Sequence, residues 1–247
     1  MKISKFELVD RCLFWEEKKI LIVGDLHLGY EDYLNESGVA LVKTQMEETF
    51  ELFEKIFSVT GKVKKIILLG DVKHHFGGIL HREFNDFYKL IDVFKKNLYK
   101  GGKVVIVKGN HDNILEPIVL QKEFSGLVEL KDFYKEGDVL FFHGDKYGFD
   151  KIKLGAFDKN VKVLVCGHFH PAVYIREDVK TEKYKCFLLG KNKEFKKEVV
   201  VVPSFFPLVE GADVSVPRER DFSNFDVYAL SGKFNEVLKF GKVKDLK

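Results

Sequence analysis

The sequence has few cysteines and no long apolar run, and these absences exclude several classes of protein. Its three cysteines, Cys12, Cys166 and Cys186, are odd in number and scattered, which argues against a disulfide framework and fits a reducing compartment. The longest apolar runs, such as residues 199–202, are far too short to cross a bilayer. The N-terminal segment contains an acidic residue and lacks the apolar stretch of a secretory signal. We therefore expect no membrane span, and the cytoplasm is the default location.

A marked excess of one charge is also missing. The 41 basic and 38 acidic residues give a net charge of +3, which is too balanced to indicate a nucleic-acid binder from bulk electrostatics. The chain contains no Walker-type phosphate loop, nucleotide-binding glycine fingerprint or zinc ribbon, and no repeat or low-complexity linker. Its 247 residues, 45% of them hydrophobic, can bury a substantial core. We expect a single domain that covers residues 1–247.

The first half of the chain alternates between apolar runs and amphipathic stretches. An edge hairpin and three buried strands are predicted from the apolar runs, at residues 3–15, 19–23, 65–69 and 103–107. A polar loop is expected at residues 30–38. Apolar residues at helical spacing predict one helix from Val39 to Gly61 and a second from Phe84 to Leu98, which ends at glycines 101–102. This order predicts right-handed crossovers and a parallel sheet.

Strand candidates crowd the second half of the chain. They lie at residues 127–130, 133–134, 139–142, 161–166, 172–175, 185–189, 198–202 and 226–230, with one short helix expected at 150–157. A half with helical crossovers followed by a strand-rich half predicts a mixed α/β fold. In this fold two sheets pack face to face, with helices outside.

Polar side chains gather at the ends of five predicted strands. They are Asp25 and His27, Asp71, Asn110 and His111, His143, and His168 and His170. Taken alone, Gly109-Asn110-His111-Asp112 could be an ordinary tight turn with an exposed histidine. However, all eight histidines of the chain fall in these motifs or in the loop at residues 74–81, whereas histidines placed by packing would be scattered. Loops at the carboxyl ends of strands are where ligands collect in α/β proteins, so we expect a single site.

The chemistry of these side chains indicates metal binding. Carboxylates, an amide oxygen and neutral imidazoles are ligands for two divalent ions of the manganese, iron or zinc type, and a shared aspartate can bridge ions about 3.5 to 4 Å apart. In Asp25-Leu26-His27 and His168-Phe169-His170, a spacing of two places both polar side chains on the same side of an extended segment. Each pair is therefore expected to reach into one cavity. Cys166 is expected to be a small buried hydrophobe beside the site, not a ligand.

The five motifs resemble the pattern of the calcineurin-like metallophosphoesterase superfamily, which is D-x-H, GD, GNH[D/E], GH or HG, and GHxH. All five are present in this order, and the resemblance covers roughly residues 20–171. The resemblance implies a four-layer αββα sandwich and two metal sites that share Asp71. It implies that one ion is held by Asp25, His27, Asp71 and His170. The other would be held by Asp71, Asn110, His143 and His168. His111 would not be a ligand but would act on the phosphate or protonate the leaving oxygen, and Asn110 is also expected to face the substrate.

The implied mechanism follows from charge. Two cations would lower the pKa of a bridging water so that hydroxide exists near neutral pH, and they would stabilise the charge that develops in an in-line displacement. His111 suits general-acid chemistry near neutrality, because the reference pKa of histidine is about 6.5. Asp112 could orient His111 or could equally cap a turn.

The loop that contains His74, His75, His81 and Arg82 could determine substrate choice, although a solvated polar loop is an equally good interpretation. His74 stands three residues after Asp71. This GDxxH pattern is similar to that of double-strand-break repair nucleases of the superfamily, in which a histidine at the corresponding place helps position the DNA phosphate. It also appears in a branch of small bacterial and archaeal phosphoesterases, some of which are described as DNA-ligase-associated endonucleases. We predict that His74 contacts a phosphodiester.

Together these features predict a hydrolase, a two-metal phosphoesterase that is a phosphodiesterase or nuclease. Manganese is the first metal to test, with iron, zinc, nickel and magnesium as alternatives. The expected partner is a phosphodiester substrate such as nucleic acid. DNA-repair proteins are expected as further partners from family analogy alone. A small-molecule enzyme acting on cyclic nucleotides or phosphomonoesters is the main alternative, supported by the weak net charge. A non-catalytic scaffold, a role known for this fold in the retromer subunit, is disfavoured by the complete ligand set.

Overall fold

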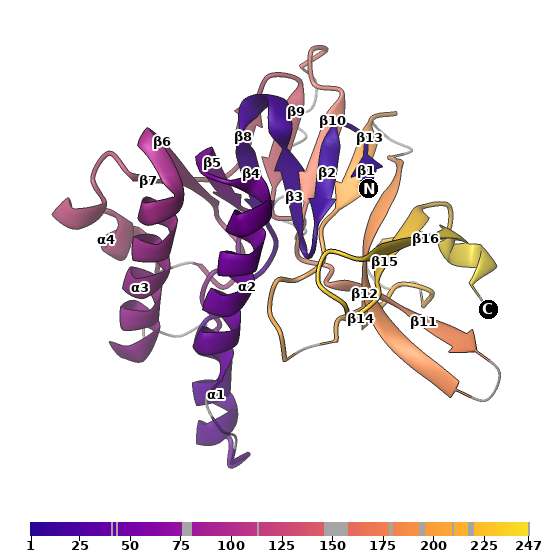
Figure 1. Ribbon diagram of the computed structural model, residues 1–247, viewed down its shortest axis with the longest axis horizontal. Helices are drawn as coiled ribbons and strands as arrows, with labels where there is room; N and C mark the ends of the chain where they lie inside the picture. Colours follow the sequence, from indigo (N-terminus) through magenta and orange to yellow (C-terminus); the bar gives the residue numbers. More distant parts are fainter. Residues whose placement is uncertain are drawn as a thin grey trace.

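The computed structural model in Figure 1 describes residues 1–40, 42, 44–75, 81–112, 114–145, 158–177, 180–192, 196–208, 210–216 and 220–246, without the side chains of 81–83 and 177. Two predictions fall outside this description. They are the short helix at residues 150–157 and the side chains of His81 and Arg82. The chain forms a mixed α/β fold with two large sheets, as the pattern of strands and helices predicts.

The first sheet has seven strands that lie in sequence order. Its first four strands are antiparallel neighbours and its last four are parallel. This arrangement confirms the edge hairpin and the three buried strands. The strands are β1 (Lys2–Ile3), β2 (Phe6–Val9), β3 (Cys12–Trp15), β4 (Ile20–Val23), β5 (Val63–Leu68), β6 (Leu98–Val107) and β7 (Val128–Lys131).

Helices cover the outer face of the first sheet, and Figure 1 shows α2 and α3 side by side in front of the parallel strands. The α-helices are α1 (Tyr30–Glu36), α2 (Gln45–Thr60), α3 (His81–Asn97) and α4 (Glu116–Val119), and the 3-10 turns are η1 (Glu16–Lys18), η2 (Lys122–Phe124) and η3 (Val243–Asp245). No helix in the described part of the chain is long and apolar enough to cross a membrane.

The second sheet has nine strands, of which β9, β10 and β13 are parallel neighbours. Long antiparallel strands extend it, and Figure 1 shows the β11–β12 hairpin projecting away from the helical side. The strands are β8 (Tyr134–Glu136), β9 (Val139–Phe142), β10 (Val163–Cys166), β11 (Pro171–Glu177), β12 (Lys180–Lys191), β13 (Glu198–Val201), β14 (Ala212–Asp213), β15 (Asp226–Leu230) and β16 (Val237–Lys242).

Alternate side chains of the central strands divide the interior into layers. In β4, Ile20 and Ile22 face the second sheet, whereas Leu21 and Val23 pack against the helices. Successive side chains of a strand point to opposite faces, so a strand that is covered on both faces reads as an unbroken apolar run. The outer face of the second sheet forms a third cluster, which includes Cys166 as a buried thiol.

The structure corrects several predicted boundaries. The expected polar loop at residues 30–38 contains α1, which is stabilised by a tertiary contact, because the buried Glu31 carboxylate accepts the backbone N–H groups of Thr44 and Gln45 at 2.9 Å each. The following helix does not begin at Val39, since this region is exposed and α2 starts only at Gln45.

Four strands also differ from expectation. Leu98 begins β6 instead of ending α3, because its backbone pairs with Val63 of β5. Strand β12 is longer than predicted because its first half pairs with β11 and its second half pairs with β13 and β15. Strands β14 and β16 were not predicted, and both lie at the edges of the second sheet, where the two residues of β14 are half-buried and β16 has several exposed residues.

Candidate metal centre

The carboxyl ends of β4, β5 and β6 meet those of β9 and β10 across the two sheets. The backbone N–H of His168 donates to both carboxylate oxygens of Asp25, at 3.1 Å each. The imidazole Nδ1 of His143 hydrogen bonds to the carbonyl of Leu69 at 2.8 Å. Each of these contacts joins a loop of the second sheet to a loop of the first, so both sheets contribute to one polar centre.

One group of possible ligand atoms comes from Asp25, His27 and His170, whose atoms lie within 4.8 Å of one another. The Nε2 atoms of the two histidines are 3.2 Å apart, and Nε2 of His170 is 3.5 Å from Asp25 Oδ1. Atoms that share an ion at about 2.0–2.2 Å lie about 3 Å from each other, so this spacing suits a metal site.

A second group consists of Asp71, His143 and His168. His168 Nδ1 lies 3.1 Å from His143 Nε2, which is in turn 3.4 Å from Asp71 Oδ2. The side-chain oxygen of Asn110 lies 3.0 Å from the same His143 nitrogen, so Asn110 adjoins this group. These four side chains are the ones that the family resemblance implies for one ion.

Asp71 lies between the two groups. Its Oδ2 atom is 3.4 Å from His143 Nε2 on one side and 3.8 Å from His27 Nε2 on the other. Its Oδ1 atom accepts the backbone N–H of His111 at 3.0 Å. A carboxylate in this place can serve two ions at once, which is the bridging position that the resemblance implies.

The electrostatics of the centre favour cations. Burial raises the pKa of the Asp25 carboxyl, but the neighbouring His170, His143 and His27 lower it further than burial raises it. Burial lowers the pKa of His143, yet its hydrogen bond to Asp71 and the charges of Asp71 and Asp25 raise it to about 10. Two buried carboxylates therefore hold a proton on His143 in the absence of a metal, and metal binding would release that proton. The donor set fits two divalent ions.

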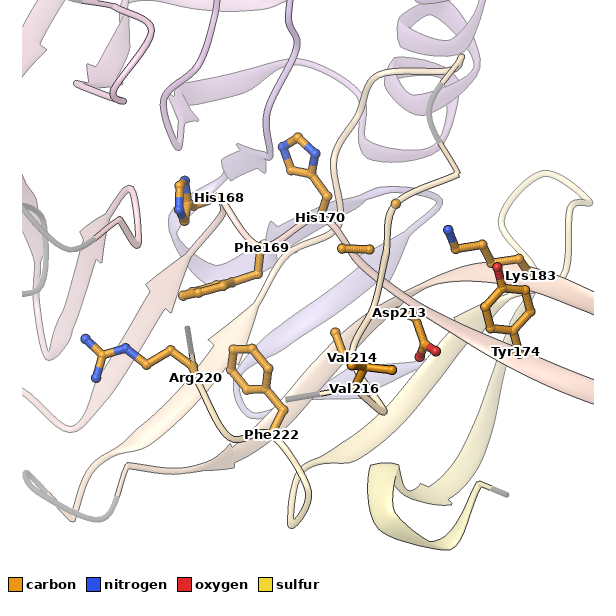
Figure 2. Close-up of a pocket in the computed structure, with 12 residues that line it drawn as sticks. His168, Phe169, His170, Tyr174, Lys183, Asp213, Val214, Val216, Arg220 and Phe222 are labelled. Carbon is orange, nitrogen blue, oxygen red and sulfur yellow. The ribbon is translucent and has the colours of Figure 1, made fainter. Parts of the chain in front are cut away.

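Backbone strain directs several of these side chains. His27, Asp71, His168 and His170 have φ values of 46°, 48°, 67° and 43°, in the left-handed region that residues other than glycine rarely adopt. The expectation that both motifs with a spacing of two are extended is therefore wrong. Asp25 and His27 do share one group, but Figure 2 shows the rings of His168 and His170 turned apart, and each belongs to a different group.

Two glycines allow the backbone to approach the carboxylates closely. A Cβ atom at Gly109 would lie 2.2 Å from Asp71 Oδ1, and one at Gly167 would lie 2.6 Å from Asp25 Oδ2. Neither glycine has a positive φ. The close contact, and not a turn conformation, is therefore what requires glycine in these motifs.

His111 lies at the rim of the centre. Its Nδ1 atom hydrogen bonds to the carbonyl of His74, and its Nε2 atom lies 3.9 Å from Asp71 Oδ2. The buried Asp112 carboxylate accepts the backbone N–H groups of Val72 and Gly109, at 3.0 Å each. Of the two roles considered for Asp112, the structure shows the turn cap, and burial raises the pKa of this carboxyl to about 6.

His74 also reaches the centre. Its Nδ1 atom is 3.3 Å from His27 Nδ1, and its ring stacks at 5.2 Å from the ring of His111. His27, His74 and His111 form a third group of closely spaced ligand atoms. Burial lowers the pKa of His74 to about 4, so His74 is neutral at pH 7 and its Nδ1 can accept a hydrogen bond from an N–H at His27 Nδ1. The neighbouring His75 accepts a hydrogen bond on its backbone carbonyl from the Lys73 ammonium group.

Several residues of the centre were not identified from the sequence. Tyr30, Tyr33 and Phe206 form an aromatic wall beside His74, in which the two tyrosine rings lie 4.6 and 5.0 Å from the imidazole. The buried Gln45 donates from Nε2 to the carbonyl of His27 at 2.9 Å and so fixes this strained loop. The sequence signal for this wall was the spacing of Tyr30 and Tyr33, which are three residues apart. This spacing is common in helices and does not by itself indicate a site.

Comparisons with known proteins bear on the family and the fold of this chain. A family model described as calcineurin-like phosphoesterase matches residues 18–155. The solved structure of nuclease MPE from Pseudomonas putida is similar, with a TM-score of 0.62 and 19% identity, over 95% of this chain and 94% of that chain. This likeness shows the fold.

Two further solved structures are less similar. A protein of unknown function from Aquifex aeolicus has a TM-score of 0.40 and 22% identity, over 60% of this chain and 77% of that chain. An archaeal phosphodiesterase has a TM-score of 0.40 and 14% identity, over 90% of this chain and 98% of that chain. No curated protein matches the sequence.

Proposed function

Because the chain belongs to the calcineurin-like phosphoesterase family, and is therefore a hydrolase acting on ester bonds, we propose that it is a two-metal phosphodiesterase that cleaves nucleic acid. The position of Asp71 between two groups of buried ligand atoms is the observation that carries this proposal. A phosphomonoesterase, a cyclic-nucleotide phosphodiesterase and a scaffold are the competing outcomes of the test below.

Each proposed ion has four ligands from this chain. The first set is Asp25, His27, Asp71 and His170, and the second is Asp71, Asn110, His143 and His168. The short distances within the two groups support these sets. When bound, the two ions would acidify a water molecule and neutralise charge on the phosphoryl oxygens. Manganese is proposed first, because oxygen and imidazole ligands without thiolates suit it.

The remaining residues act on the substrate. His111 is held by the hydrogen bond of its Nδ1 to the His74 carbonyl, which turns its Nε2 atom toward Asp71, and in the imidazolium form this Nε2–H would donate a proton to the leaving oxygen. Asn110 is proposed to face both an ion and the substrate. The proposed enzyme is a single domain over residues 1–247 in a reducing compartment such as the cytoplasm, which its three buried free thiols support.

A substrate panel tests the proposal. Protein loaded with manganese is assayed on a chromogenic diester, its monoester counterpart, 2′,3′-cyclic nucleotides and single-stranded DNA. We expect kcat/KM for the chromogenic diester to exceed that for the monoester, together with cleavage of the DNA. Preference for the monoester or for cyclic nucleotides would support the small-molecule alternative. Absence of turnover on every substrate, with metal bound, would support the scaffold.

His74 is proposed to contact the phosphodiester. His74→Ala is expected to raise KM for diester substrates by roughly 5- to 30-fold, the equivalent of about 1–2 kcal/mol for one lost polar contact. The steady-state constants of the variant are compared with its manganese content. Unchanged turnover and KM would refute this role. Loss of manganese at an unchanged KM would instead mean that His74 orients His27, as the 3.3 Å contact between their Nδ1 atoms permits.

A further inference from the structure

A cavity of about 590 Å³ adjoins the metal centre on the side of the second sheet. His168, Phe169 and His170 form its inner end, so it begins at two proposed metal ligands. Figure 2 shows the cavity between these residues on one side and Asp213, Val214 and Phe222 on the other. All of its lining residues lie beyond residue 155, where the family match ends, so the cavity is a feature that the family model does not cover.

The walls of the cavity combine aromatic rings with cations. Phe169 and Phe222 meet edge to face with their ring centroids 5.0 Å apart. Tyr174 of β11 is 49% exposed, and Lys183 of β12, its partner in the strand register, places Nζ 5.5 Å from the tyrosine ring centroid. Figure 2 shows Tyr174 and Lys183 on one side of the cavity and Arg220 on the other.

These features match the way proteins bind single-stranded nucleic acid. Exposed aromatic rings stack on bases whatever their sequence, and lysine or arginine beside them neutralises the backbone phosphates. The volume lies within the range of about 300–1,000 Å³ that is typical of ligand pockets. A paired base cannot enter such a recess without leaving its duplex, which costs a few kcal/mol, so an unpaired strand is favoured.

We propose that this cavity binds an unpaired base and the adjacent phosphate of the strand whose scissile phosphate lies at the metal centre. The inference rests on the proposed function and specifies its substrate class as single-stranded nucleic acid. Tyr174 stacks on the base and Lys183 pairs with the phosphate next to it. Asp213 is an acidic lining residue on the same side of the cavity as Tyr174 and Lys183, and its carboxylate accepts the N–H of Ser215 at 2.9 Å, so the charge of Lys183 has to outweigh this carboxylate for the phosphate to bind.

The test compares variants on two substrates. Tyr174→Ala is expected to lower kcat/KM for a single-stranded oligodeoxynucleotide by about 5- to 150-fold, the equivalent of about 1–3 kcal/mol for one stacked base. The loss on the small chromogenic diester should be at least several-fold smaller. Tyr174→Phe, which keeps the ring, should restore activity on the oligonucleotide.

Lys183 has a matched control in Lys239, an exposed lysine of β16 whose Nζ lies 5.4 Å from the ring centroid of Tyr228. Lys183→Ala should make the negative slope of log affinity for the oligonucleotide against log salt shallower by about 0.7, the value for one phosphate contact on a single strand. Lys239→Ala should leave the slope and the activity unchanged. Equal effects of the two lysine variants would overturn the proposal.

A binding measurement separates this inference from the proposed activity. Calorimetry with a nucleoside monophosphate and with inorganic phosphate should show tighter binding of the nucleotide to the manganese-loaded protein. Tyr174→Ala should remove that difference and leave the affinity for phosphate unchanged. Equal affinities in the unmodified protein would refute the base subsite even if diesters are cleaved. A nucleotide preference that depends on Tyr174 would support the subsite even if the activity panel fails.

Discussion

Asp71→Asn is expected to lower kcat/KM for a diester by at least about 100-fold, because changes to residues that merely support metal ligands already cost about 10- to 100-fold in affinity or activity. The substitution removes a negative charge from between the two groups of ligand atoms. It also replaces one carboxylate oxygen with a nitrogen. In the unmodified protein, Asp71 Oδ2 lies 3.4 Å from His143 Nε2 and Asp71 Oδ1 accepts the backbone N–H of His111 at 3.0 Å. Both proposed ions should therefore bind more weakly.

Asp86 of α3 provides the control for this substitution. Its carboxylate is also buried, but it lies 3.8 Å from Lys89 on the same helix and belongs to none of the three groups of ligand atoms. Asp86→Asn should leave kcat/KM and manganese content within about twofold of the unmodified protein. The bridging role of Asp71 would be refuted if Asp71→Asn retained both ions and more than a tenth of the activity.

His111→Ala is expected to lower kcat by about 10²- to 10⁴-fold without loss of manganese, since this is the usual contribution of a positioned general acid. The loss should be smaller on the chromogenic diester, because a nitrophenolate leaves without being protonated. On an oligonucleotide the leaving oxygen is an alkoxide, and there the full loss is expected. Both kcat values are measured at saturating manganese, with metal content determined on the same samples.

His143→Ala is the contrasting variant. It removes a proposed ligand whose Nε2 lies within 3.4 Å of Asp71, Asn110 and His168 atoms, so it should release metal as well as lower activity. If His111→Ala also released metal, the assignment of His111 as a residue that acts on the substrate would be wrong. An equal loss on both substrates would argue against proton donation to the leaving oxygen.

The strands and the positions of the motifs could be predicted from the sequence because they depend on local pattern. The run Ile20–Val23 is apolar throughout since both faces of β4 are covered, and Asp25 follows it after Gly24. Parallel pairing then places the loops after neighbouring strands at one edge of each sheet. The metal centre was then predicted from the carboxylates, amide and imidazoles that follow these strand ends.

Other features depend on tertiary contacts and could not be predicted in this way. Helix α1 lacks a strong apolar pattern and is fixed by the Glu31 carboxylate at the start of α2. The left-handed backbone at His168 and His170 sends their rings to different groups, whereas their spacing alone indicated a shared direction. The cavity beyond them is assembled from the β11–β12 hairpin and from β14, which pairs with β11 although it lies more than 30 residues after it in the chain.

The central claim is that this chain holds two ions on either side of Asp71, and an anomalous difference map from a crystal grown with manganese tests it most directly. We expect two peaks about 3.5 to 4 Å apart, the separation typical of two-metal sites. One peak should lie beside Asp25, His27 and His170, and the other beside Asn110, His143 and His168, with Asp71 in contact with both. A single peak, or a peak among His27, His74 and His111 in place of either, would contradict the claim.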